Sequence, residues 1–436
     1  MSGVHDAIVV GHGLPGLLTA LDLAEVGLSV VVVGRGEDLP HDFEPDPDGV
    51  LAAAMERVAA PLDGSGHEPE RDALPSFAPA RTPLLLDPTG AWAEQAEPAV
   101  LGIPAVPLAE RTLRLLGTGG AIRAYRDRIA PLLTIGKTRF FGDLVRKRLG
   151  RAALERLSEP LLRERYGVPA ERVEVAVAAP GLNETLSRAG SLTAAALAYS
   201  DRNVARETGA MPTAGWKRFR DVLLQRLVAY GVELREGAIA EIGGVGDESR
   251  NVVLETGEVL RARALVLGFG DDPRSATAET SFSAITPELA PAAWRVHAEI
   301  DILPVDGVAA GAVAVRTLDE WSLRIDGRED RDRAILRSAA SNPVVDPDEA
   351  ELAAILASAG AAAVADAEWR ARVAAAPFRS VDERHRVEDA LRVRLAEEAE
   401  VIPLGRVLHG DDLAAAVAWA HEAAVHLRRH LLGLAD

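Results

Sequence analysis

Apolar and polar positions near the start of the chain form three successive patterns. Ala7 to Val10 is a continuous apolar run, typical of a short strand that is buried on both faces of a sheet. An amphipathic stretch follows and ends at Gly27, and Ser29 to Val33 is a second apolar run. The pattern therefore predicts a strand, a helix and a second strand.

The pattern then changes in blocks. Residues 38–80 are rich in Pro, Asp and Gly, which predicts loops around one short helix at Leu51 to Ala60. Residues 110–165 are mostly helical in pattern and strongly charged. Phe219 to Tyr230 has the spacing of an amphipathic helix, and the strand-like residues 231–242 follow it.

Strand patterns dominate the next part of the chain. Residues 251–270 predict a hairpin that turns at Thr256 to Glu258 and leads into a buried strand at Ala264 to Leu267. Residues 293–339 alternate apolar and polar positions, which favours antiparallel strands. Residues 349–376 are Ala-rich with regular apolar spacing, and we expect a helix there.

Three glycines lie between the first predicted strand and helix, at Gly11, Gly13 and Gly16. In a β-α-β unit this spacing is typical of a dinucleotide-binding turn. The first glycine permits the tight turn, the second lets the backbone approach a pyrophosphate, and the third lets the helix pack closely on the strand. The phosphate charge would then lie at the helix N-terminus.

Composition excludes several kinds of chemistry. The 436 residues are enough for two to three domains, and the net charge of −18 argues against nucleic acid as a partner. The absence of cysteine excludes disulfides, thiol catalysis and cysteine-based metal sites. The histidines lack metal-ligand spacing, so we expect no metal.

The sequence also indicates where the protein is found. No apolar run is long enough to span a bilayer, and no signal peptide precedes the first strand. We therefore expect a cytoplasmic protein without a transmembrane segment.

Several separated segments resemble one family. The segments "VLGIPAVP", "GDLVRKRLGRAALERLSEPLLRERYGVPAERVEVAVAAPGL" and "PTAGWKRFRDVLLQRL" are similar, in order and spacing, to segments of bacterial protoporphyrinogen/coproporphyrinogen oxidases. That family lies within the flavin amine oxidase superfamily. The likeness covers most of residues 5–270 and returns weakly at the C-terminus.

The resemblance implies an α/β fold in two parts. A Rossmann-like FAD/NAD(P)-binding domain would be built from residues 1–75, 205–275 and 395–436. Residues 76–204 and 276–394 would form an inserted substrate domain with helices and an antiparallel sheet. The flavin would accept hydride from a porphyrinogen-like or other large hydrophobic small molecule.

The resemblance also assigns two residues outside the glycine-rich turn. The segment at Gly215 is similar to the family's second cofactor-facing element. Ile239 falls at the position whose backbone brackets the adenine in relatives. We therefore expect Gly215 and Ile239 to lie beside the turn from Gly11 to Gly16 and to contact the cofactor.

The chain departs from the family after its second predicted strand. The family's ribose-binding Glu falls on Gly34, which has no side-chain acceptor. Arg35 follows, and an Arg beside a small residue suits the 2′-phosphate of NADP. The family's Gly-Gly loop is also missing after this strand.

A further departure lies near the C-terminus. The family's Ala-Gly-Asp or Ala-Gly-Asn segment falls on Leu404, Gly405 and Arg406, and the glycine-rich turn falls on Gly410. Arg406 could clasp pyrophosphate oxygens in place of the lost polar acceptor. The family's Ser-Gly pair becomes Trp419 and Ala420, and this bulk could enter the space of a flavin.

Two hypotheses of function follow from these departures. The first is a divergent FAD-dependent oxidoreductase that acts on a porphyrinogen-like or other large hydrophobic substrate. The second is a catalytically degenerate, flavin-free protein that acts as a binding or complex-forming subunit with a protein partner, or that binds NADP(H). No side-chain constellation in the sequence identifies a catalytic residue.

Overall fold

The computed structural model describes residues 4–34, 39–62, 69–79, 81–130, 138–203, 208–243, 250–268, 289–344 and 347–434. It divides into two compact units. Unit 1 comprises Met1–Pro79, Ala205–Pro291 and Arg384–Asp436, and unit 2 comprises Ala80–Val204 and Ala292–Glu383. The predicted α/β fold class is confirmed, because parallel and antiparallel sheets occur together with many helices.

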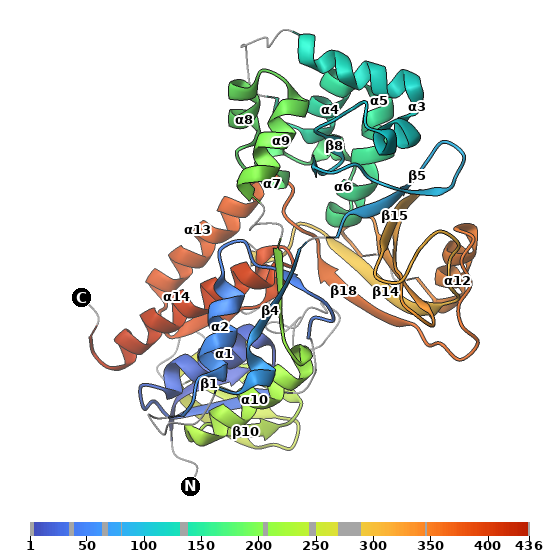
Figure 1. The fold of residues 1–436 in the computed structure, drawn as a ribbon. Helices are drawn as coiled ribbons and strands as arrows, with labels where there is room; N and C mark the ends of the chain where they lie inside the picture. Colours follow the sequence, from blue (N-terminus) through green and yellow to red (C-terminus); the bar gives the residue numbers. More distant parts are fainter. Residues whose placement is uncertain are drawn as a thin grey trace. The chain divides into compact units, whose positions relative to one another are not determined.

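Unit 1 brings distant segments of the chain into one layered structure (Figure 1). Its elements are β1 (His5–Val10), α1 (Leu14–Ala24), β2 (Val30–Gly34), β3 (Glu44–Pro45), α2 (Val50–Ala59), η1 (Arg71–Ala73), β4 (Pro75–Pro79), β9 (Thr208–Pro212), α10 (Gly215–Ala229), β10 (Glu233–Glu236), β11 (Ile239–Gly243), β12 (Arg250–Leu254), β13 (Val259–Gly268), β19 (Val401–Leu404), η7 (Arg406–His409) and α14 (Leu413–Leu431).

The main sheet of unit 1 has the strand order β10-β2-β1-β13-β12-β11, and β19 also pairs with β13. Strands β10, β2, β1, β13 and β19 run parallel, while β12 and β11 form an antiparallel hairpin. Parallel strands need crossover connections, and α1 supplies the one between β1 and β2. A second sheet has the order β3-β9-β4.

Helix α1 lies in the core of unit 1, because every one of its residues is buried. The helix packs against α14 and α10 as well as the sheet. Burial of each Leu side chain contributes roughly 1.5–3 kcal/mol relative to exposure. This burial on all sides fixes the position of the turn that precedes the helix.

Unit 2 combines helices with a mostly antiparallel sheet that includes one parallel pair of strands (Figure 1). Its strands are β5 (Pro83–Leu86), β6 (Trp92–Glu94), β7 (Ala99–Val100), β8 (Ile103–Pro104), β14 (Trp294–Ile302), β15 (Val313–Leu318), β16 (Trp321–Asp326), β17 (Asp332–Ser338) and β18 (Arg370–Ala375). Its helices are α3 (Glu110–Tyr125), η2 (Arg126–Ile129), α4 (Phe141–Leu149), α5 (Arg151–Ala153), η3 (Leu154–Ser158), α6 (Glu159–Tyr166), η4 (Ala170–Arg172), α7 (Val175–Ala178), α8 (Leu182–Ala189), α9 (Leu192–Asn203) and α12 (Glu349–Ser358), and α13 (Val381–Glu397) continues into unit 1.

The sheet of unit 2 has the order β18-β14-β17-β16-β15-β5-β6. Two apolar cores lie in this unit, one mainly among the helices from α3 to α9 and one between the sheet and α12. The antiparallel strands expected in residues 293–339 are present as β14 to β17.

The structure corrects the predicted helix over residues 349–376. Helix α12 ends at Ser358, and Gly360 follows with a φ of +73°. The same Ala-rich segment then forms β18, which pairs antiparallel with β14. Pairing with an available sheet edge outweighed the helix preference of alanine.

Arg295 joins the helices of unit 2 to its sheet. This residue of β14 is only 1% exposed, and its guanidinium donates to the carbonyls of Arg163, Glu164, Arg165 and Ser338 at 2.8–3.2 Å. The first three carbonyls belong to the last turn of α6, and that of Arg163 also accepts from the Gly167 N–H at 2.9 Å. The single guanidinium therefore supplies donors to the carbonyls at the end of this helix.

We expect Arg295→Met to lower the free energy of unfolding by about 3 kcal/mol, because buried carbonyls lose their charged donor. Urea denaturation followed by circular dichroism measures the change. Arg370→Met removes an exposed Arg from the same sheet and should change stability little. Equal stability of the two variants would contradict this role of Arg295.

We also expect Gly11→Ala to lower the free energy of unfolding by about 2 kcal/mol or more. Gly11 has a φ of +95°, and an added Cβ would lie 2.8 Å from the carbonyl oxygen of Gly268. The matched control is Gly257→Ala, since Gly257 has a φ of +83° and open space around it. If Gly11→Ala lowers the free energy of unfolding no more than Gly257→Ala does, the close contact of Gly11 with Gly268 is not the cause of the loss.

Candidate functional site

The carboxyl ends of the parallel strands in unit 1 meet at one edge of the sheet, where ligands bind in open α/β folds. The Gly11 N–H donates to the Val33 carbonyl at 2.7 Å, which ties the turn after β1 to β2. An added Cβ on Gly268 would lie 2.5 Å from the Val10 carbonyl oxygen. Three chain segments therefore approach each other closely by their backbones.

The N-terminus of α1 faces this edge without a side-chain partner. Gly13 is its N-cap residue, and no side chain caps the helix. The first turn also carries no acidic residue. Exposed N–H groups and the helix dipole favour an anion at such a position.

The three glycines of the turn differ in their surroundings. A Cβ on Gly16 would contact Val9 at 3.4 Å, whereas a Cβ on Gly13 would meet only the Pro15 ring, at 3.9 Å. Gly16 therefore lies against the strand, and Gly13 faces open space. These contacts are what a turn with a phosphate in front of Gly13 requires.

His12 lies within the turn, and its Nε2 atom is buried without a hydrogen bond to the described residues. Burial lowers the pKa of His12 below its ordinary value, and the positive charge of Arg220 lowers it further. The carboxylate of Glu236 acts in the opposite direction. The turn is thus within electrostatic reach of α10 and of the end of β10.

The other residues that the sequence assigned to the cofactor lie on several elements of unit 1. Gly215 begins α10, the helix that also carries Arg220. Ile239 begins β11, just after the end of β10. Arg35 lies outside the described residues, so its predicted contact with a 2′-phosphate stays a prediction.

Gly405 and Gly410 enclose the short helix η7 at the end of β19. Leu404 pairs with Gly268, so Gly405 follows the strand end that neighbours the turn. Both glycines have positive φ, of +136° and +62°. The chain thus turns sharply between β19 and α14.

Arg406 lies between two carboxylates. Its guanidinium donates to both oxygens of Glu44 at 3.2 and 3.3 Å and to the Asp411 carbonyl at 2.9 Å. Its Nε is 3.1 Å from the Asp411 carboxylate. Sequence reasoning missed the pairing with Glu44, because Glu44 lies 362 positions away. Arg406 thus already has partners within the protein. Its predicted contact with a pyrophosphate stays a prediction.

Trp419 of α14 is buried, and its indole N–H donates to the Pro403 carbonyl at 3.0 Å. The ring is therefore held against the end of β19. His409 of η7 is 8% exposed, and its Nε2 makes no hydrogen bond to the described residues. Burial lowers the pKa of His409 to about 4.

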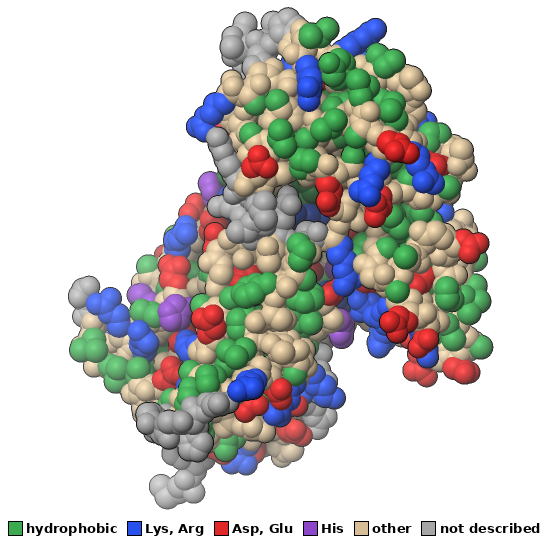
Figure 2. All heavy atoms as spheres, in the orientation of Figure 1, with side chains coloured by type: hydrophobic (Ala, Val, Ile, Leu, Met, Phe, Trp, Pro, Cys, Tyr) green, Lys and Arg blue, Asp and Glu red, His purple; other side chains and the backbone are tan. Residues whose placement is uncertain are grey.

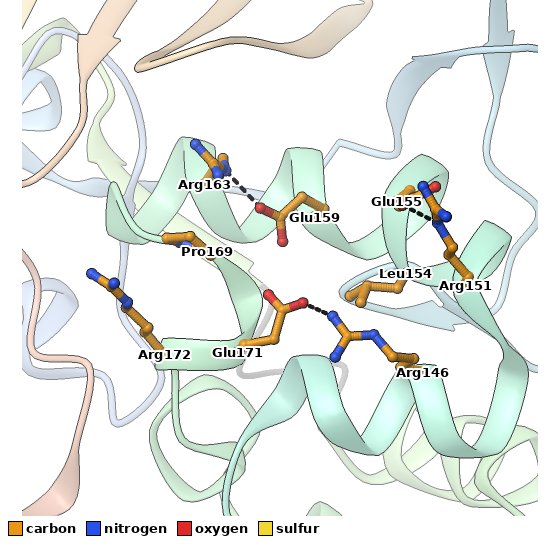
Figure 3. A pocket seen from close by; sticks show the side chains of 9 residues that line it. All are labelled: Arg146, Arg151, Leu154, Glu155, Glu159, Arg163, Pro169, Glu171 and Arg172. Atoms are coloured by element: carbon orange, nitrogen blue, oxygen red, sulfur yellow. Dashed lines mark hydrogen bonds and ion pairs between the residues drawn. The ribbon is translucent and has the colours of Figure 1, made fainter.

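Unit 2 contains a cavity of about 490 Å³ among its helices (Figure 3). Its lining residues are Arg146, Arg151, Leu154, Glu155, Glu159, Arg163, Pro169, Glu171 and Arg172. Each of the three Glu side chains forms an ion pair with an Arg of the same cavity. The charges therefore largely compensate each other, and no catalytic residue can be assigned here.

Charged side chains of both signs also share the molecular surface. On the face that Figure 2 shows, Lys and Arg side chains lie among Asp and Glu side chains. Within the described residues, no group of His, Cys, Asp and Glu has the geometry of a metal site. The helices in that part of the chain include none with the length and apolar character to cross a membrane.

Comparisons with known proteins reveal the fold. Neither a protein-family model nor a curated protein matches the sequence. Among solved structures, a candidate protoporphyrinogen oxidase from Exiguobacterium sp. has a TM-score of 0.69 at 17% identity, covering 99% of this chain and 100% of its own.

Two amine oxidases are also similar. Cyclohexylamine oxidase from Brevibacterium oxydans has a TM-score of 0.55 at 14% identity, covering 99% of this chain and 100% of its own. A putrescine oxidase mutant from a redesign of cofactor binding has a TM-score of 0.53 at 11% identity, covering 99% of each chain. At these identities the likeness concerns the fold alone. The chain therefore shares its fold with these three proteins.

We expect the buried His409 to make stability depend on pH. Its folded-state pKa of about 4 lies below the ordinary 6.5, so the unfolded chain takes up a proton first as the pH falls. The contribution of His409 to the free energy of unfolding is present above pH 6.5 and is lost as the pH falls toward 4. The loss is about 1.4 kcal/mol per pH unit at most.

Urea denaturation of the wild type and of His409→Gln across this pH range measures the effect. The variant should lack the part of the pH slope that the buried imidazole causes. His385→Gln removes an exposed histidine of α13 and serves as the control. Identical slopes for wild type and His409→Gln would contradict the prediction.

Proposed function

We propose that this protein is an FAD-binding oxidoreductase that acts on a small-molecule substrate. The observation that carries the proposal is the open N-terminus of α1 behind Gly13, at the carboxyl edge of a parallel sheet. Such an arrangement suits the pyrophosphate of a dinucleotide. The fold shared with cyclohexylamine oxidase and putrescine oxidase supports the flavin as the cofactor.

The residues present fit the nucleotide half of FAD. Backbone N–H groups between His12 and Gly16, apart from Pro15, which has none, would hold the pyrophosphate, and the absence of a side chain at Gly13 leaves room for it. Gly215, Ile239, Gly405 and Gly410 would contact the cofactor through their backbones. A bound flavin supplies a two-electron acceptor for hydride removal from the substrate.

The substrate class rests on two supports. The sequence segments described above resemble porphyrinogen oxidases, and a candidate protoporphyrinogen oxidase is a structural neighbour. We propose a porphyrinogen-like or other large hydrophobic substrate.

The ion pairs of Arg406 favour a second candidate function. A family-like protein without flavin could retain the fold and act as a binding or complex-forming subunit. In such a protein, a guanidinium held by Glu44 and Asp411 would stabilise the fold. Binding of FAD by the purified protein distinguishes the two functions.

We expect the wild type to bind FAD and to show the visible absorption bands of oxidised flavin. Gly13→Asp should weaken FAD binding by about 100-fold or more, because its carboxylate would lie close to the pyrophosphate charge. Gly13 has an ordinary φ of −67°, so the substitution itself does not strain the backbone. Fluorescence titration with FAD measures the affinities.

Gly13→Asn is the matched control, since it adds the same bulk without the charge. Circular dichroism verifies that each variant is folded. Equal FAD affinity of the wild type and Gly13→Asp would show that this turn is not part of the FAD-binding site. A wild type that binds no FAD would contradict the proposed function and favour the flavin-free candidate.

A further inference from the structure

The end of β2 has no room for the carboxylate that commonly binds ribose in dinucleotide-binding folds. Gly34 has a φ of +148°, and an added Cβ would lie 3.1 Å from the Gly11 Cα and 3.2 Å from the Gly11 nitrogen. Both contacts are with backbone, which cannot rotate away. A side chain at this position would therefore strain the backbone and crowd the turn.

A carboxylate is available on the neighbouring strand. Strand β10 runs parallel to β2, and its last residue, Glu236, pairs with Gly34. Neighbouring strands lie about 4.8 Å apart, so Glu236 begins one strand spacing from the lost position. The register is continuous from Glu233 to Glu236, which fixes this placement.

The side chain of Glu236 is exposed and makes no ion pair with the described residues. Glu233, at the other end of the strand, pairs instead with His5 and Arg235. The negative charge of Glu236 also acts to raise the pKa of His12, within the glycine-rich turn. Its pairing with Gly34 places Glu236 at the strand end beside the region in which the nucleotide of the proposed function would lie.

We propose that Glu236 binds the ribose hydroxyls of the adenosine, replacing the acceptor lost at Gly34. The inference rests on the proposed nucleotide site and assigns its specificity. A carboxylate accepts hydrogen bonds from the 2′- and 3′-hydroxyls, and it repels a 2′-phosphate. Glu236 therefore selects a nucleotide with a free 2′-hydroxyl, such as FAD, over NADP.

The test compares ADP, 2′-deoxy-ADP and adenosine 2′,5′-bisphosphate as probes, each titrated by calorimetry into the wild type and variants. The wild type should bind ADP about 10- to 100-fold more tightly than 2′-deoxy-ADP, because one charge-assisted hydrogen bond is lost. It should bind the bisphosphate more weakly than ADP. In Glu236→Ala the preference for the 2′-hydroxyl should fall to less than about threefold, and FAD affinity should fall by about 10-fold or more.

Glu258→Gln is the control. This residue is exposed in the turn between β12 and β13, and β13 reaches the candidate site only at its other end. Glu236→Gln tests the charge at constant size, and it should lose part of the preference. Circular dichroism and thermal denaturation verify the fold of each variant.

The outcomes separate this inference from the proposed function. A Glu236→Ala variant that discriminates between ADP and 2′-deoxy-ADP as the wild type does would overturn the role of Glu236. A wild type that binds ADP with this preference but does not bind FAD would contradict the flavin proposal and support Glu236 as the ribose residue. A wild type that binds none of these nucleotides would overturn both.

Discussion

The close contact between Gly11, Gly34 and Gly268 is the constraint on which the candidate site depends. These residues lie at the carboxyl ends of β1, β2 and β13, and a side chain on any of them would meet backbone within 3.2 Å. The contact brings the turn before α1 against two strand ends. It also leaves the end of β2 at Gly34 without a side chain that accepts from a ribose hydroxyl.

Helix α1 connects this close contact to the core of unit 1. The helix is buried along its whole length between the sheet, α10 and α14, so its N-terminus cannot move independently of the core. Arg57 of α2 adds an ion pair of 2.7 Å to the buried Asp22 of α1. Asp22 is thus partnered inside the core, while the N-terminus of α1 has no side-chain cap. The free backbone donors of α1 lie at the edge where a ligand would supply their acceptors.

Local sequence patterns predicted the elements of this region but not their neighbours. Continuous apolar runs correspond to β1 and β2 because these strands are buried on both faces. The glycine spacing identified the turn, and the loss of a carboxylate at Gly34 was visible in the sequence. Glu236 was missed because its relevance depends on the pairing of β10 with β2, which no local pattern specifies.

The same limit applies to other long-range contacts. Alanine favours helices, so the sequence predicts one helix over the Ala-rich segment, whereas β18 forms through its pairing with β14. The sequence suggests Arg406 as a pyrophosphate ligand because it does not show the ion pair with Glu44. Burial of His409 could not be read from the sequence of η7 alone.

The ion pairs of Arg406 affect how an anionic cofactor would be bound. Its guanidinium side chain is 12% exposed, and that of Glu44 is 17% exposed. If Arg406 turned to a pyrophosphate, Glu44 would lose a partner in a partly buried place, where an uncompensated carboxylate is costly. Backbone donors at α1 have no such competing partner, since no side chain caps this helix. A dinucleotide in this fold would therefore be held at its phosphates mainly by the turn from Gly11 to Gly16, and Arg406 would act by joining η7 to β3.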